Sequence, residues 1–117
     1  MLRIGHLEFD FPVVQAALSG YSYAPMRLIA RRLGAPYTLS HVVLDKSIAL
    51  CEKARRKLLG ELPAEDHPIG GQLMGAEPGL FAEAARQMVA LGYDVIDINF
   101  GCPVKKVLGR FRGGYLL

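Results

Sequence analysis

Short apolar runs alternate with amphipathic stretches along this chain, and this alternation constrains the fold more than any other feature. Strand-length runs lie at residues 12–18, 37–43, 69–74 and 94–98, and helical patterns lie between them at residues 23–33, 46–59 and 78–91. Strands that alternate with helices in this way are joined by right-handed crossovers, which make the strands parallel. The sequence therefore predicts an α/β fold with a parallel sheet.

The first residues predict a different local structure. Residues 2–4 and 7–9 alternate apolar and polar side chains around Gly5 and His6, which is typical of a short β-hairpin. The run that follows, at residues 12–18, is almost continuously apolar and favours a strand buried on both faces of a parallel sheet. We expect the hairpin to cover one end of the domain and to lead into this strand.

Residues with capping chemistry mark the expected ends of the helices. Ser22 and Asp45 carry side-chain oxygens that can accept hydrogen bonds from the first turns of the first two helices. Gly60 has the backbone freedom that ends the second helix, and Pro78 suits the first turn of the third. Cys51 falls in the middle of the second helix, where we expect a small buried packing residue.

Cys102 lies on a tight turn directly after the last apolar run. Gly101 and Pro103 favour a change of chain direction around it, so the thiol is presented at the C-terminal end of a strand. In parallel α/β folds, ligands bind at this end of the sheet. A reactive thiol and a buried packing residue are both consistent with this position, because free cysteines are often buried.

Composition restricts the class of protein. The chain has 117 residues, of which 51% are hydrophobic and 21% are charged, which is ordinary for a globular domain with one modest core. No apolar run approaches the ~18 to 20 residues of a membrane span, and the first residues lack a secretory pattern, so we expect no membrane association and a cytoplasmic location. The two cysteines are expected to stay reduced. Histidines and cysteines show no paired ligand spacing, so no metal site is expected.

Basic residues gather in two segments although the net charge is only +3. Residues 103–117 contain four basic side chains and no acidic one, and residues 53–57 contain four more. Either segment could contact phosphate groups. A solvated helix face is the alternative for both segments, and for residues 53–57 it is favoured, because most charge runs on helices simply face water.

Several motifs resemble those of the tRNA-dihydrouridine synthases. They are Gln72-Leu-Met-Gly75, Pro78, Ala82-Glu-Ala-Ala85, Gly92 and, most specifically, Asp97-Ile-Asn-Phe-Gly-Cys-Pro-Val-Lys-Lys-Val107. Looser similarity upstream extends the resemblance over nearly all 117 residues. The resemblance implies an N-terminal TIM barrel and a C-terminal helical domain that helps to hold tRNA. A complete barrel takes about 250 residues, so residues 1–117 correspond to about four βα units of an incomplete FMN-dependent catalytic domain.

The resemblance also implies a reaction, namely reduction of the C5–C6 double bond of a uridine in tRNA. The hydride comes from reduced FMN that NADPH regenerates, and the cysteine of the motif protonates C5 from the opposite face. This role is carried over to Cys102, whose thiol must stay protonated until the transfer. The other implied contacts are Ala17, Leu18 and Ser19 beside the flavin, Gln72 on the flavin ring, Asn99 on the flavin or uracil, and Lys105 and Lys106 on RNA phosphates.

Two segments depart from the family pattern, and half of the barrel is missing. Ala16-Ala-Leu-Ser-Gly20 replaces Ala-Pro-Met-Ala-Gly, and Ser40-His-Val42 replaces Thr-Glu-Met, which leaves His41 as the candidate substitute for a carboxylate. Phosphate sites of TIM barrels commonly lie on the loops after strands 7 and 8. We therefore expect the isolated 117 residues to be inactive.

Two alternatives remain open. The first is another FMN-dependent barrel enzyme such as dihydroorotate dehydrogenase, which has a similar Asn-x-Ser-Cys-Pro turn after a strand. Gly101 and residues 104–106 favour the tRNA enzyme over it. The second is a non-catalytic half barrel, whose open strand edges would need covering and which therefore predicts self-association.

Overall fold

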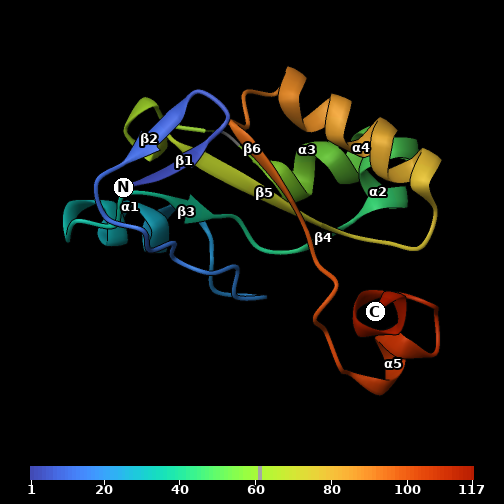
Figure 1. The fold of residues 1–117 in the computed structure, drawn as a ribbon. Helices are drawn as coiled ribbons and strands as arrows, with labels where there is room; N and C mark the ends of the chain where they lie inside the picture. The colour runs from blue at the N-terminus through green and yellow to red at the C-terminus, as the bar shows by residue number, and fades with distance from the viewer. Residues whose placement is uncertain (61) are drawn as a thin grey trace.

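A parallel sheet forms the centre of the molecule in the computed structural model, which describes residues 1–60 and 62–117. Strand β5 (Ile69–Met74) pairs in parallel with β6 (Val95–Ile98) and with the short strands β3 (Thr38–Leu39) and β4 (Val43–Leu44) (Figure 1). Gly70 lies opposite both β3 and β6, and Leu73 lies opposite both β4 and β6. The strands β3 and β4 therefore share one edge of β5, and β6 lies on the other. The predicted parallel α/β sheet is confirmed.

The strand predicted at residues 37–43 is divided into β3 and β4. Leu39 pairs with Gly70 and Val43 pairs with Leu73, so four steps along one strand match three steps along β5. This extra residue is the signature of a β-bulge, which reverses the face on which the following side chains lie. Periodicity within one strand does not reveal such a change, because the register is set by the partner strand.

The prediction of a fully buried strand at residues 12–18 is wrong. Only Gln15 forms a bridge, with Thr38, and its backbone bonds Tyr37 O and the Leu39 N–H, both at 3.0 Å. The side chain of Val13 is 50% exposed. Among the described residues the segment has a sheet partner on one side only, and most of its side chains are exposed.

The first helix, α1 (Ala24–Arg32), begins one residue later than expected, so Ser22 does not occupy the cap position. Tyr23 occupies the cap position and makes no side-chain capping bond. The Ser22 hydroxyl instead accepts a hydrogen bond from Leu18 N at 2.6 Å and donates one to Ala16 O at 3.4 Å. Ser22 thus closes the turn before the helix, because its side chain points back along the chain.

The helix predicted at residues 46–59 is two helices, α2 (Asp45–Leu50) and α3 (Glu52–Leu59). Cys51 adopts an extended conformation between them, is exposed, and accepts a hydrogen bond from Ala54 N at 3.4 Å, so it caps α3 and is not the expected buried packing residue. Asp45 was expected to cap this helix, but it lies inside the first turn of α2, one position after the observed cap at Leu44. The end of α3 at Gly60 is as predicted. The break at Cys51 allows residues from both helices to enter one core.

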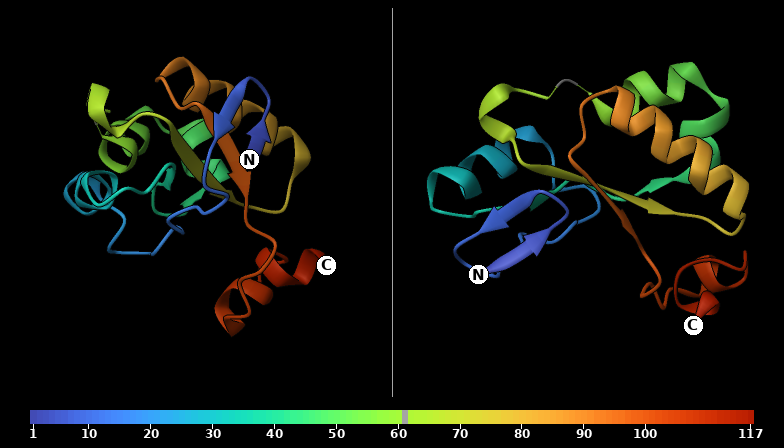
Figure 2. Two further views of the ribbon diagram at one scale, coloured as in Figure 1. Left: turned by 60° about the vertical axis from the view of Figure 1, so that its left-hand side comes forward. Right: turned by 45° about the horizontal axis from the view of Figure 1, so that its top comes forward.

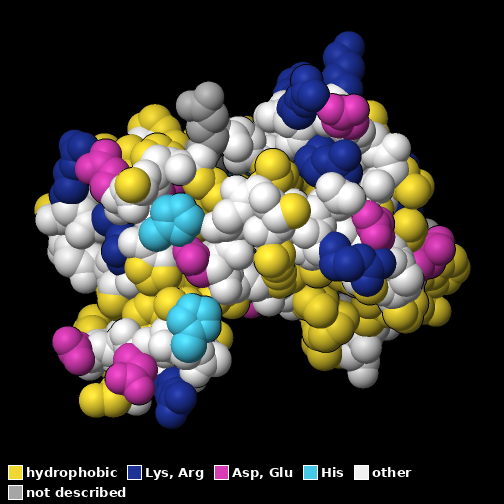
Figure 3. All heavy atoms as spheres, turned by 90° about the horizontal axis from the view of Figure 1, so that it is seen from above, with side chains coloured by type: hydrophobic (Ala, Val, Ile, Leu, Met, Phe, Trp, Pro, Cys, Tyr) yellow, Lys and Arg dark blue, Asp and Glu magenta, His cyan; other side chains and the backbone are white. Residues whose placement is uncertain are grey.

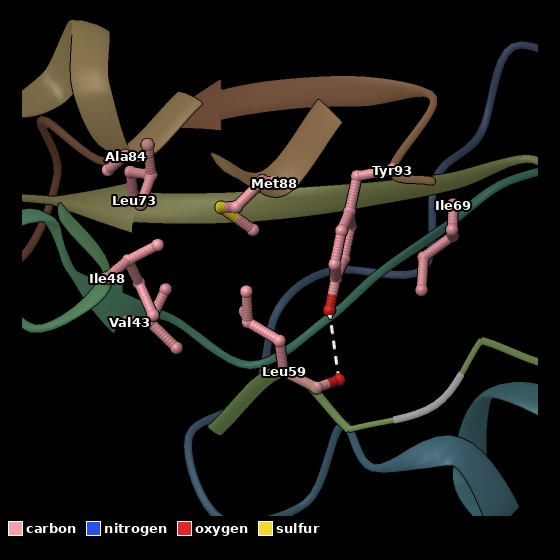
Figure 4. Packing of buried hydrophobic residues seen from close by; sticks show 8 residues of the cluster. All are labelled: Val43, Ile48, Leu59, Ile69, Leu73, Ala84, Met88 and Tyr93. Carbon is pink, nitrogen blue, oxygen red and sulfur yellow. Dashed lines mark hydrogen bonds between the residues drawn. The ribbon is translucent and has the colours of Figure 1, made fainter. Parts of the chain in front are cut away.

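The helices α2, α3 and α4 (Pro78–Ala90) cover one face of the sheet (Figures 1 and 2). The predicted helix at residues 78–91 is confirmed, and Ala84 and Met88 on it are fully buried. Tyr93, which precedes β6, donates its hydroxyl to Leu59 O at 3.2 Å and links the start of that strand to α3 (Figure 4). The core on this face consists of Val43, Ile48, Leu59, Ile69, Leu73, Ala84, Met88 and Tyr93.

The hairpin of β1 (Leu2–Ile4) and β2 (Leu7–Phe9) lies over the other face of the sheet (Figure 2). Phe9 packs against Tyr37 with ring centroids 5.5 Å apart, and Leu39 completes a second small core. This core lies at the beginning of β5, because Leu39 pairs with Gly70. The C-terminal half of that face is left without apolar cover from the hairpin.

Three short helices complete the chain. The 3-10 helix η1 (Ala64–Asp66) contacts α1 through Arg27, whose guanidinium forms a buried ion pair with Asp66 at 2.6 Å. The helices α5 (Lys105–Leu108) and η2 (Gly113–Leu116) pack on each other and project away from the sheet (Figure 1). No helix in the described part of the chain has both the length and the apolar character to cross a membrane.

Candidate functional site

The face of the sheet opposite the helices carries a polar pair near the C-terminal ends of β5 and β6. A side chain at Gly71 would point at Met88 of α4, whereas one at Gly70 would point at Tyr37 on the hairpin side. Side chains alternate along a strand, so Gln72 shares the face of Gly70. Asp97 pairs directly with Gln72, and Gln72 Nε2 donates a hydrogen bond to Asp97 Oδ2 at 2.7 Å. The pair therefore lies on the side away from α4.

Asn99 extends this polar group beyond the end of β6. Its backbone N–H still donates to Leu73 O at 2.8 Å, which keeps it in line with the strand. Its side-chain Nδ2 donates to Gln72 Oε1 at 3.1 Å, and its Oδ1 accepts from the N–H groups of Gly101 at 3.0 Å and Cys102 at 3.1 Å. An asparagine that bonds the backbone two residues ahead forms a turn, so Asn99 shapes the chain around the thiol.

The Cys102 turn is held from a second side by the C-terminal segment. Gly114 N donates to Cys102 O at 3.0 Å. Gly113 has a φ of +57°, and a side chain there would come within 2.9 Å of Cys102 Cβ, so glycine is required at this position. Cys102 is partly buried and its thiol is free.

These groups surround an open hollow of about 510 Å³. This volume is in the range of small-molecule sites, which span roughly 300–1,000 Å³. Leu18 is not among the lining residues, and its side chain is 48% exposed. The hollow is lined by Ala17, Ser19, Val42, Gln72, Asp97, Ile98, Asn99, Phe100, Gly101 and Cys102. The structure thus brings together five of the residues named from the sequence, which are Ala17, Ser19, Gln72, Asn99 and Cys102.

Asp97 gives this face of the sheet a negative charge. Burial raises the pKa of Tyr37 to about 12, and the carboxylates of Asp97 and Asp94 contribute to the shift. In the sequence, Asp97 stands out only as the first residue of the motif that contains Cys102. Asp97 lies two residues before Asn99, and in an extended chain this spacing places both side chains on one face. This spacing could have indicated that Asp97 belongs to the site.

His41, the candidate substitute for the missing carboxylate, is not among the residues that line this hollow. Its neighbour Val42 lines the hollow, whereas the His41 ring packs at a tilt against Tyr23 with centroids 5.0 Å apart. His41 lines a separate hollow of about 260 Å³ with Tyr23 and Arg27. Burial, and secondarily the positive charge of Arg27, lowers the pKa of His41. The β-bulge after Leu39 is consistent with this change of side.

Lys105 and Lys106 also lie outside the hollow. Both are exposed in the short helix α5, just after the Cys102 turn. Other basic side chains gather on the helical side of the molecule, with acidic side chains between them (Figure 3). Within residues 1–60 and 62–117, no group of three or more His, Cys, Asp or Glu side chains could hold a metal ion.

The arrangement suits a planar, polar ring that reacts with a proton donor. The amides of Gln72 and Asn99 each retain hydrogen-bonding capacity beyond their mutual contact, because an amide nitrogen carries two protons. The Cys102 thiol can hold a proton beside them. A parallel α/β sheet with these groups at the C-terminal ends of its strands is characteristic of a ligand-binding or catalytic domain.

Comparison with known proteins identifies the family. A model of the dihydrouridine synthase (Dus) family matches residues 14–117, and the chain belongs to this family.

Curated relatives match the chain along its whole length. The tRNA-dihydrouridine synthase B of Pseudomonas aeruginosa is 37% identical over 118 residues, covering 100% of this chain and 35% of the relative. The probable tRNA-dihydrouridine synthase of Rickettsia conorii is 34% identical over 119 residues, with coverage of 100% and 35%. The synthase B of Xanthomonas axonopodis pv. citri is 35% identical over 117 residues, with coverage of 99% and 35%. The chain spans about a third of the length of these relatives.

Proposed function

We propose that this chain is the N-terminal part of the catalytic domain of a tRNA-dihydrouridine synthase, with Cys102 as the proton donor. The observation that carries the proposal is the placement of the Cys102 thiol beside the amides of Gln72 and Asn99 in one hollow. The names of the curated relatives support tRNA uridine as the substrate. A tRNA substrate in turn favours a cytoplasmic location.

The sheet supports the proposal that residues 1–117 are about four βα units of a TIM barrel. The segment at Gln15, the strands β3 and β4, then β5 and β6 neighbour one another in chain order and run in parallel. Strands of a TIM barrel follow this order, and the C-terminal ends of the strands carry the active site. The hollow is open on one side, and the further strands of a barrel would close that side.

The residues around the hollow fit the ring system of FMN. Gln72 and Asn99 offer donors and acceptors to the mixed edge of an isoalloxazine, and Ala17 and Ser19 form part of the opposing wall. No lysine or arginine is among the residues that line the hollow, so the phosphate of FMN would need cationic groups from elsewhere. FMN bound at these residues and reduced by NADPH would supply a hydride for C6 of the uracil.

The role of Cys102 follows from the charge that this reaction creates. Addition of hydride to C6 leaves negative charge that extends to C5, and C5 then needs a proton. The S–H bond of Cys102 breaks, the proton forms a bond to C5, and the thiolate regains a proton from water. The bonds from Asn99 to the Cys102 turn hold this thiol in place beforehand.

The substrate is large and negatively charged, and the exposed Lys105 and Lys106 are suited to it. They follow the Cys102 turn on α5, so RNA that enters the hollow would pass close to them. Contacts from lysine to phosphate position a nucleic acid without reading its sequence. We propose this role for both residues.

Membership of the dihydrouridine synthase family favours the tRNA enzyme over a dihydroorotate dehydrogenase. A second candidate function, a self-associating half barrel, is favoured by one observation. The side chains of Ile98 and Phe100 are 45% and 42% exposed at the end of β6, which pairs only with β5 among the described residues.

The decisive experiment replaces Cys102 by alanine in the protein expressed from its complete gene. We expect flavin content to be unchanged and dihydrouridine formation in tRNA to fall by about 10²- to 10⁴-fold, the usual contribution of a general acid. Flavin is measured by absorbance, and dihydrouridine by mass spectrometry of digested tRNA. The matched control is Cys51→Ala, whose thiol is exposed between α2 and α3 and which should retain activity. Undiminished product from Cys102→Ala would exclude Cys102 as the acid.

A further inference from the structure

Asp97 stands at one end of a chain of hydrogen bonds that leads to Cys102. Its Oδ2 accepts from Gln72 Nε2 at 2.7 Å, and Gln72 Oε1 accepts from Asn99 Nδ2 at 3.1 Å. Asn99 Oδ1 then accepts from the backbone N–H groups of Gly101 and Cys102. Two side-chain amides therefore connect a carboxylate on β6 to the backbone of the thiol turn.

The two ends of this chain of bonds have opposite chemistry. A carboxylate only accepts hydrogen bonds, and a backbone N–H only donates them. Each amide between them has a donor at one end and an acceptor at the other. Turning either amide over would bring two donors or two acceptors together, so the chain of bonds from Asp97 to Cys102 has a single direction.

The strand register makes the first bond specific to Asp97. Asp97 and Gln72 are directly paired across β5 and β6, so their side chains leave the sheet side by side on the same face. Asp94, the neighbouring carboxylate, bonds His67 Nδ1 and Ile69 N, both at 2.7 Å, near the start of β5. In the described part of the chain, the Asp94 carboxylate forms no hydrogen bond with Asp97, Gln72 or Asn99.

We propose that Asp97 is a positioning residue, which orients the amides of Gln72 and Asn99 and through them holds the Cys102 turn. Its importance for catalysis rests on the proposed function of Cys102. The positioning itself is a property of the folded chain and is measurable without turnover.

The test measures Cys102 and its turn directly, in the protein expressed from its complete gene and with Cys51→Ser as background. In Asp97→Ala we expect Cys102 to be alkylated by iodoacetamide roughly two- to tenfold faster, the factor that corresponds to one lost hydrogen bond. The alkylated peptide is quantified by mass spectrometry. Amide hydrogen exchange at Gly101 and Cys102 should accelerate by a similar factor. Asp97→Asn should restore rates to within about twofold of the background protein, because its Oδ1 can still accept from Gln72.

Gln72→Met keeps the test decisive if Asp97→Ala fails to fold. Gln72→Met breaks the same chain of bonds in the middle and should accelerate alkylation and exchange equally. Adding Asp97→Ala to it should cause no further acceleration, because the two act through one path. Asp94→Ala is the matched control and should leave both rates at Cys102 unchanged.

Unchanged rates in Asp97→Ala and Gln72→Met would overturn the proposal, and so would an Asp97→Asn variant that behaves like Asp97→Ala. These readouts do not depend on the reaction. A Cys102→Ala enzyme that still formed dihydrouridine would refute the catalytic role, and the alkylation and exchange rates would still decide the positioning role.

Discussion

Individual side chains at this site are positioned by hydrogen bonds from residues far away in the chain. Asn99 Oδ1 accepts a hydrogen bond from the backbone N–H of Cys102, three residues later, and Asn99 Nδ2 donates one to Gln72, which is 27 residues away. The surroundings of His41 are likewise set by residues that are distant in the sequence. Its sequence position suggested a substitute for a site carboxylate, and its ring lies against Tyr23 in a different hollow.

His41 also makes stability depend on pH. Its folded-state pKa is lowered from 6.5, chiefly by burial, so the unfolded chain takes up a proton at higher pH than the folded chain does. Stability contributed by neutral His41 is therefore present above pH ~6.5 and is lost as pH falls from there toward the folded pKa. We expect His41→Phe, which keeps a ring beside Tyr23, to reduce the loss of unfolding free energy between pH 7.5 and 5.5 in urea titrations. An unchanged pH dependence would contradict this assignment.

Among the elements, β5 has the most restrictive surroundings. It lies between β3 and β4 on one edge and β6 on the other, and its two faces meet the hairpin core and α4. A side chain at Gly70 would lie 2.2 Å from the Tyr37 hydroxyl and 2.4 Å from Leu39. A side chain at Gly71 would lie 2.0 Å from Met88 Cε, so both glycines are a requirement of close packing.

This packing predicts that Gly70→Ala destabilises the protein. The Tyr37 ring is held by Phe9 and cannot move away freely, so we expect a loss of about 1–3 kcal/mol of unfolding free energy. Gly79→Ala is the matched control, because nothing lies within 4 Å of a side chain there and α4 should gain up to about 1 kcal/mol. Chemical unfolding measures both changes. Equal stability of the Gly70→Ala and native proteins would show that the hairpin core can rearrange.

At the scale of the whole molecule, the sheet ends at two incompletely paired edges. The segment at Gln15 bonds only on its β3 side, and β6 pairs only with β5 within the described residues. An open apolar hollow of about 490 Å³ adjoins the end of β6 and is lined by Ala76, Pro78, Phe81, Ile98, Phe100 and Leu116. Free edges beside apolar surface promote pairing with another chain.

We therefore expect the 117-residue chain to self-associate in solution. Ile98→Lys places a charge beside the free edge and should weaken association, as charges at natural sheet edges do. Val89→Lys, on the exposed surface of α4, is the matched control and should leave association unchanged. Sedimentation velocity over a range of concentrations measures the effect. A monomer at all concentrations would refute the half-barrel alternative.

The sequence alone determined the features that depend on neighbouring residues. Its periodicity predicted β5, α4 and the parallel sheet, and the turn residues around Cys102 predicted a thiol at the end of a strand. The position of Gln72 near the end of β5 followed from the same pattern. These features are local because propensity, alternation and turn chemistry act over a few residues.

Only the tertiary structure decided the features that depend on register and on partners. The bulge after Leu39, the break at Cys51 and the exposure of Val13 arise from what lies beside each segment in space. The contact between Asp97 and Gln72 spans 25 residues and exists only in one register of β5 and β6. A shift of one residue would place these side chains on opposite faces, and no local pattern specifies that alignment.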